Sequence, residues 1–247
     1  MHEKVTCPKP LKSISHEFLA RGALDLQQAE FWNNQTFTKF AKREKFVQVE
    51  KNLIQLVNEY ISCNMDVIDV CCGNGEYTKL ISKKCRTIIG YDISESLLQI
   101  ANSEFPLTNG RYVKMNLDKE ILLPHSLDVI FFMGSLSSII KDETVDTLIG
   151  SFYNSLKYNG ILLTRDSLTY NKRIEKMHKR GNFAVYRNAY RHIDMVISKG
   201  FSLEKILTNW AGKATFNKFY VYRKRRPLEK HLSGGSIRSW LYSVFRA

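Results

Sequence analysis

The sequence has no apolar run long enough to cross a membrane. The longest candidate, residues 129–140, falls short of the roughly 18–20 apolar residues of a membrane-spanning helix. The opening residues, MHEKVTCPKPLK, carry charge and proline where a signal peptide needs an apolar segment. We therefore expect no transmembrane segment and a cytoplasmic protein.

Cysteines are few, and their spacing suits neither disulfides nor a metal. The five cysteines are odd in number, and Cys71 and Cys72 are adjacent. This arrangement fits neither a disulfide framework nor a Cys-x-x-Cys site. The sequence therefore predicts a reducing compartment and no metal site.

The charge is strongly positive. Lys and Arg total 37 against 24 Asp and Glu, which gives a formal net charge of +13 and a pI near 9.5. Such a charge favours anionic partners, namely nucleic acid, phosphorylated metabolites or an anionic membrane surface. A basic surface without a specific partner explains it equally well. Disorder is excluded, because 12% aromatic residues need a packed core.

Short apolar runs typical of strands alternate with apolar periodicity typical of helices. Strands are predicted at residues 67–70, 87–91, 111–115, 127–133 and 161–164. Helices are predicted after the first, second and fourth of these strands, and at residues 45–61 and 186–199. Ser94 is a candidate N-cap, and Asn159-Gly160 supplies the left-handed residue at which a helix ends. Residues 201–209 and 218–223 are too close for a helical crossover and should pair antiparallel.

The predicted fold is therefore α/β: an open, mostly parallel twisted sheet with helices on both faces and an antiparallel terminal hairpin. We divide the chain into an N-terminal extension (1–44), a Rossmann-like domain (45–226) and an amphipathic tail (227–247). Apolar residues recur at helical spacing in the tail. This pattern suits a membrane surface, a partner, packing onto the domain or a dimer seam.

A glycine-containing turn follows the first predicted strand and leads directly into a helix, within residues 67–78. Gly73 and Gly75 let the backbone approach a ligand, and the helix N-terminus favours an anionic group there. Asp92 ends the second strand, where a carboxylate can accept both hydroxyls of a ribose. Dinucleotide sites want a third glycine where this chain has Thr78, and Asp69 favours a positively charged cofactor.

These segments resemble the class I methyltransferase superfamily. Its pattern D-x-G-x-G-x-G lies over residues 69–75, with Cys71 in place of the first glycine. Tyr91-Asp92-Ile93-Ser94 is similar to the ribose-binding strand end, Asn116-Leu117 to the adenine-recognising position, and Met133-Gly134-Ser135 to the strand end near the transferred methyl group. The resemblance implies S-adenosylmethionine as the cofactor, S-adenosylhomocysteine as the product and no metal. The implied cofactor-binding residues are Asp69, Cys71, Cys72, Gly73, Gly75, Tyr77, Asp92, Ile93, Asn116, Leu117 and Met133.

Candidates for binding the acceptor, or for catalysis, follow the fifth strand. Arg165 and Asp166 sit where a base or a substrate anchor belongs, although they also suit a structural ion pair. The basic segment at residues 172–180 is expected to form a lid over an anionic acceptor. Tyr190 and His192 cannot share a helix face, so we expect one to face the cleft and the other to be solvated.

The sequence predicts direct methyl transfer to a small anionic or polar metabolite, for example in a secondary-metabolite or glycan pathway. A tRNA or rRNA methyltransferase is the main alternative, because of the pI and the basic residues 223–226. Against it, no Asn-Pro-Pro-Tyr-type tetrapeptide follows the fourth strand. An NAD-dependent oxidoreductase and a non-catalytic cofactor-binding protein are less favoured. Phe31-Trp32 either caps the cofactor or packs onto the helix at residues 45–61.

Overall fold

The computed structural model describes residues 28, 30–32, 34, 44–116, 124–178 and 182–226. Leu117 and the predicted tail, 227–247, lie outside the described residues, as does most of the predicted N-terminal extension. No helix within the described ranges is both long enough and apolar enough to cross a membrane.

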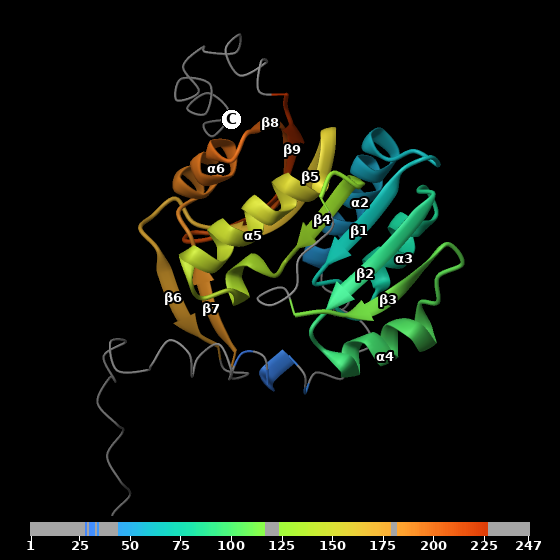
Figure 1. Ribbon diagram of the computed structural model, residues 1–247. Helices are drawn as coiled ribbons and strands as arrows, with labels where there is room; N and C mark the ends of the chain where they lie inside the picture. Colours follow the sequence, from blue (N-terminus) through green and yellow to red (C-terminus); the bar gives the residue numbers. More distant parts are fainter. Residues whose placement is uncertain are drawn as a thin grey trace, which may run out of the picture.

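The core is a seven-stranded sheet in the order β3-β2-β1-β4-β5-β9-β8 (Figure 1). The first five strands are parallel, and β9 lies antiparallel between β5 and β8. The predicted sheet and its terminal antiparallel hairpin are therefore confirmed. The strands are β1 (Asp66–Val70), β2 (Thr87–Asp92), β3 (Gly110–Lys114), β4 (Leu127–Met133), β5 (Leu156–Leu168), β8 (Phe201–Ala211) and β9 (Phe216–Lys224).

Helices cover both faces of the sheet, as Figure 1 shows. Successive residues of a strand point to opposite faces, so Phe131 packs with α2 and Phe132 with α5. Both phenylalanines are almost fully buried, which stabilises the fold by about 1.5–3 kcal/mol each. The helices are α2 (Glu44–Tyr60), α3 (Glu76–Ser82), α4 (Glu95–Glu104), α5 (Asp142–Ser155) and α6 (Ala189–Ser198); α2 and α3 line one core, α5 and α6 the other.

The region between β5 and α6 differs from the prediction. β6 (Ile174–Met177) and β7 (Phe183–Tyr186) form an antiparallel hairpin, so the predicted basic lid at residues 172–180 contains a strand. The helix predicted at residues 186–199 begins instead at Ala189, where Asn188 caps it by accepting a hydrogen bond from the Arg191 N–H. The error arose because a short apolar run such as residues 183–186 suits a helix or a strand.

Strand β5 is longer than predicted at both ends. Helix α5 ends at Ser155, and Asn159 adopts the expected left-handed conformation (φ +65°) only four residues later, inside β5. The carboxyl ends of β1, β2, β4 and β5 all meet at one edge of the sheet. The β6–β7 hairpin and a short 3-10 helix, η1 (Leu136–Ser138), contact each other beyond this edge.

Candidate functional site

The turn after β1 is built from three left-handed residues. Cys71, Gly73 and Gly75 have φ values of +59°, +57° and +79°. For an L-residue such as Cys71 this conformation costs about 1–2 kcal/mol. The backbone therefore explains the glycine spacing of the motif. It also shows that Cys71 keeps the required conformation at an energetic cost.

Asp92 ties this turn to the end of β2. Its Oδ2 accepts a hydrogen bond from the Gly73 N–H at 2.8 Å, and its Oδ1 accepts one from the Ser94 N–H at 2.9 Å. Burial raises the pKa of Asp92, and the backbone N–H groups of Ser94 and Gly73 oppose that rise. Ser94 in turn accepts a hydrogen bond from the Leu97 N–H at the start of α4, which confirms the predicted N-cap.

Asp69 is a second carboxylate beneath the turn. Its side chain is buried, and its Oδ2 accepts a hydrogen bond from the Thr78 hydroxyl at 2.6 Å. Burial raises the pKa of Asp69 to about 7; the nearby Asp92 adds to the rise, while Thr78 and Arg165 oppose it. In the sequence, Thr78 served only as evidence against a dinucleotide site. In the structure its hydroxyl also holds a carboxylate of the turn.

Arg165 and Asp166 do not form the structural ion pair that was one interpretation of the sequence, because neighbouring residues of β5 face opposite sides of the sheet. The Arg165 guanidinium lies 5.7 Å from the centre of the Tyr77 ring. It also packs against Gly134, where a Cβ would collide with it. Its Nε has no hydrogen-bond partner among the described residues. Arg165 therefore lies beside the glycine turn and the end of β4.

Asp166 faces α6 and lies close to His192. The distance from Asp166 Oδ2 to His192 Nε2 is 3.6 Å, and both side chains are buried. The Thr164 hydroxyl donates to the same Oδ2 at 2.6 Å. Within the described part of the chain, Asp166 Oδ1 and both ring nitrogens of His192 lack hydrogen-bond partners. Of the pair Tyr190 and His192, His192 is therefore the buried residue, and it lies on the apolar face of α6.

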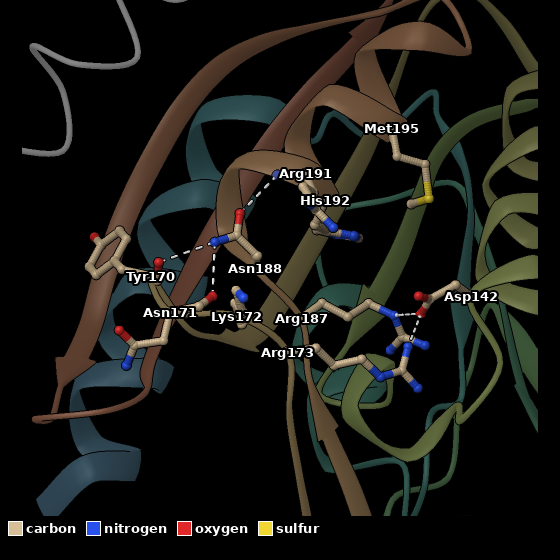
Figure 2. A pocket seen from close by; sticks show the side chains of 10 residues that line it. All are labelled: Asp142, Tyr170, Asn171, Lys172, Arg173, Arg187, Asn188, Arg191, His192 and Met195. Carbon is tan, nitrogen blue, oxygen red and sulfur yellow. Dashed lines mark hydrogen bonds and ion pairs between the residues drawn. The ribbon is translucent and has the colours of Figure 1, made fainter. Parts of the chain in front are cut away.

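A pocket of about 730 Å³ lies beside His192 (Figure 2). Its walls come from the start of α5, the segment after β5 and the first turns of α6. Four cationic side chains and one carboxylate line it, in addition to His192. The lining residues are Asp142, Tyr170, Asn171, Lys172, Arg173, Arg187, Asn188, Arg191, His192 and Met195.

Two of the four cations hold the walls of the pocket together. Arg187 contacts Asp142 at 2.7 Å and donates to the carbonyl oxygens of Leu136 and Ile139. Arg173 contacts Asp142 at 2.6 Å and Glu175 at 2.7 Å. Burial raises the pKa of Asp142, but the two guanidiniums outweigh it and the pKa lies below its usual value. Sequence reasoning missed Arg187 and Asp142, because residues 45 positions apart share no local pattern.

Only some of the other residues proposed for the acceptor side line the pocket. Lys172 and Arg173 line the pocket, whereas Lys176 is exposed on β6 and residues 179–180 lie outside the described residues. Tyr190 packs its ring 6.1 Å from that of Tyr170 and is not among the lining residues.

Part of the N-terminal extension runs along the carboxyl edge of the sheet, in blue between β7 and α4 in Figure 1. The Gln28 side chain donates to the Phe183 carbonyl at 2.5 Å and accepts from the Phe183 N–H at 3.2 Å. The Trp32 carbonyl accepts from the Ser94 hydroxyl at 2.9 Å. These contacts place Gln28 against the β6–β7 hairpin and Trp32 against the turn that follows Asp92.

The remaining cofactor candidates lie at the same edge. The Cys72 N–H donates to the Tyr91 carbonyl at 3.0 Å, and Ile93 follows Asp92. Asn116 follows β3, next to Met115, whose N–H donates to the Asp92 carbonyl at 2.9 Å. Met133 ends β4.

The basic residues 223–226 are largely occupied within the fold. Arg223 forms a two-pronged contact with Glu204, at 2.6 and 2.9 Å. Lys224 is buried and donates to the carbonyl oxygens of Tyr153 and Leu156. Arg225 also contacts Glu204, at 3.0 Å.

Comparison with known proteins gives a consistent result. A family model described as a methyltransferase domain matches residues 67–160. A protein of Geobacillus sp. (strain WCH70), provisionally named a methyltransferase, is 30% identical over 107 residues, which are 42% of this chain and 43% of that protein. The chain thus spans less than half the length of this relative.

Solved structures resemble most of the chain. A DhpI–SAH complex has a TM-score of 0.65 at 15% identity, covering 82% of this chain and 97% of that one. An S-adenosylmethionine-dependent methyltransferase from Mesorhizobium loti has a TM-score of 0.58 at 15% identity, covering 70% of this chain and 97% of that one. The [4+2]-cyclase SpnF has a TM-score of 0.61 at 16% identity, covering 76% of this chain and 85% of that one. At these identities the likeness establishes a shared fold.

Proposed function

We propose that the protein is a class I methyltransferase that uses S-adenosylmethionine and methylates an oxygen or nitrogen atom of a small anionic or polar metabolite. The methyltransferase-domain match over residues 67–160 and the shared fold support the reaction type. The observation that carries the choice of acceptor is the position and charge of the pocket. Residues that follow the carboxyl ends of β4 and β5 line it, and four of them are cationic. In an open α/β sheet, ligands bind beyond these strand ends.

The residues at the glycine turn fit the cofactor. A carboxylate has about four acceptor positions, so Asp92 can receive the ribose hydroxyls while it holds the turn. In this proposal Asn116, which follows β3 at the same edge of the sheet, recognises the adenine edge. Asp69 and Arg165 offer opposite charges to the ammonium and carboxylate of the methionine part. In this proposal Arg165 serves the cofactor instead of the acceptor.

When bound, S-adenosylmethionine supplies an electrophilic methyl carbon on a sulfonium, which leaves as a neutral thioether. The chain then contributes chiefly alignment: the turn and Asp92 fix one reactant while the pocket orients the other. A base is needed only where the nucleophile carries a proton. In this proposal His192, which borders the pocket and lies 3.6 Å from Asp166, takes that role.

A tRNA or rRNA acceptor has less support. The strongest sequence feature in favour of an RNA acceptor is the run of basic residues 223–226. Three of these four side chains are engaged within the protein. Phosphate contacts need cations that are free to meet a nucleic-acid backbone. A small acceptor therefore agrees better with the distribution of charge.

The experiment is a labelling assay with methyl-labelled S-adenosylmethionine and extract of the source organism, split into small-molecule, lipid and nucleic-acid fractions. We expect label in the small-molecule fraction, and mass spectrometry then identifies the acceptor. Label in nuclease-sensitive material would overturn the small acceptor. Cofactor binding without incorporation in any fraction would overturn methyl transfer itself, since one fold hosts several chemistries.

A further inference from the structure

We propose that the pocket beside α6 contains a subsite for a phosphate-type oxyanion, formed by the side chains of Lys172, Arg191 and His192. The inference rests on the proposed function in one respect: the oxyanion is taken to be part of the acceptor. The subsite itself depends on the pocket alone.

Two of the four cations that line the pocket are paired with other described residues, and two are not. Arg173 and Arg187 share the carboxylate of Asp142 and donate to backbone carbonyls. Lys172 and Arg191 line the same pocket, and neither side chain forms a hydrogen bond or ion pair within the described residues. A charge-assisted hydrogen bond to an oxyanion is about twice as strong as a neutral one. These two cations are therefore available to a ligand.

The N-terminus of α6 contributes its dipole but few free amides. The Ala189 N–H donates to the Thr169 carbonyl at 2.9 Å, and the Arg191 N–H donates to the Asn188 side chain at 3.2 Å. An oxyanion in the pocket would consequently be held by side chains. This distinguishes the site from one made by backbone amides, in which side-chain substitutions would matter little.

His192 is the observation that points to a ligand. It lines the pocket, its side chain is 1% exposed, and neither ring nitrogen has a hydrogen-bond partner within the described ranges. Leaving a buried polar group unpaired costs about 1–3 kcal/mol. Asp166 Oδ2 lies 3.6 Å from Nε2, so the nearest carboxylate is on that side of the ring. An oxyanion at the other nitrogen would complete the set of partners.

The test is titration of the full-length protein with inorganic phosphate, followed by calorimetry. We expect saturable binding at one site. The double variant Lys172→Gln/Arg191→Gln should lower the affinity by about tenfold or more, and His192→Asn by about fivefold. The matched control is Lys83→Gln/Lys84→Gln, which removes the same charge from an exposed turn on the other side of the sheet and should leave the affinity unchanged.

Equal losses in the two double variants would mean nonspecific attraction to a basic protein and would overturn the subsite. So would the absence of binding to the wild type. A second arm titrates methyl phosphate and acetate; tighter binding of acetate than of either phosphate would overturn the phosphate assignment. S-adenosylmethionine is titrated into the same samples. Its failure to bind would count against the proposed function, whereas the phosphate result stands independently.

Discussion

The carboxylate of Asp92 accepts a hydrogen bond from the backbone N–H of Gly73 at 2.8 Å, so the end of β2 holds the turn that follows β1 in place. The residue expected to receive the ribose thus has a structural role as well. A substitution there acts on the shape of the turn and on the ligand together.

Asp92→Ala should abolish binding of S-adenosylmethionine and also lower the free energy of unfolding. It leaves the N–H groups of Gly73 and Ser94 without their acceptor, at about 1–3 kcal/mol. Calorimetry and urea denaturation measure the two effects. Asp146→Asn, on the surface of α5, is the control and should keep cofactor affinity. Unchanged affinity in a folded Asp92→Ala protein would refute the assignment.

Asp69→Asn should change how stability depends on pH. The folded pKa of about 7 lies above the unfolded value, so between about pH 4 and 7 the native state binds more protons than the unfolded state. Stability therefore falls as the pH rises through this window. Asn cannot ionise, so the variant should not lose this stability. Its free energy of unfolding relative to that of the wild type should therefore rise by about 1–4 kcal/mol between pH 5 and pH 8. Urea denaturation at several pH values tests this, and a pH-independent difference would contradict it.

Gly75→Ala should be strongly destabilising. The residue has φ +79°, and a Cβ would lie 2.6 Å from the Tyr112 hydroxyl and 2.8 Å from the Ala101 Cβ. Backbone strain and overpacking together predict a loss of about 2–5 kcal/mol. Gly150→Ala is the matched control, since its Cβ would meet nothing within 4 Å in α5; it should gain about 0.5–1 kcal/mol. Similar denaturation midpoints for the two variants would disprove the steric account.

Arg165→Met should weaken binding of S-adenosylmethionine by about 10–100-fold, because it removes the cation proposed for the cofactor carboxylate. Calorimetry with the cofactor alone measures this without a known acceptor. Lys157→Met, which loses its contact with Asp128 at the other end of the strands, is the control. Intact cofactor affinity in Arg165→Met would return this residue to the acceptor side, where the sequence had placed it.

Local patterns predicted the backbone around the proposed cofactor site well. The strand–turn–helix order, the span of β4 and the cap at Ser94 agree with the structure, because each depends on residues close together in sequence. Asp69 and Asp92 lie at the turn for the same reason. What the sequence missed there was burial, which depends on the packed neighbours and sets the pKa of Asp69.

The proposed acceptor pocket depends on contacts between distant residues, which periodicity cannot reveal. Asp142 with Arg187, and Asp166 with His192, are juxtaposed only by the packing of α5, β5 and α6. The β6–β7 hairpin was missed because its apolar run is short, and that error moved the start of α6. His192 shares its helix face with Ala189 and Val196, so its burial follows from the helical spacing that the sequence already shows.

The Gln28 carboxamide contacts both the N–H and the carbonyl of Phe183, as a neighbouring peptide group would. These two backbone groups point away from β6, since residues on an antiparallel strand alternate in the side to which they bond. A two-stranded ribbon with such groups free is a template for pairing with another chain. The Gln28 side chain thus occupies the two backbone groups of Phe183 through which an added strand would pair at this point.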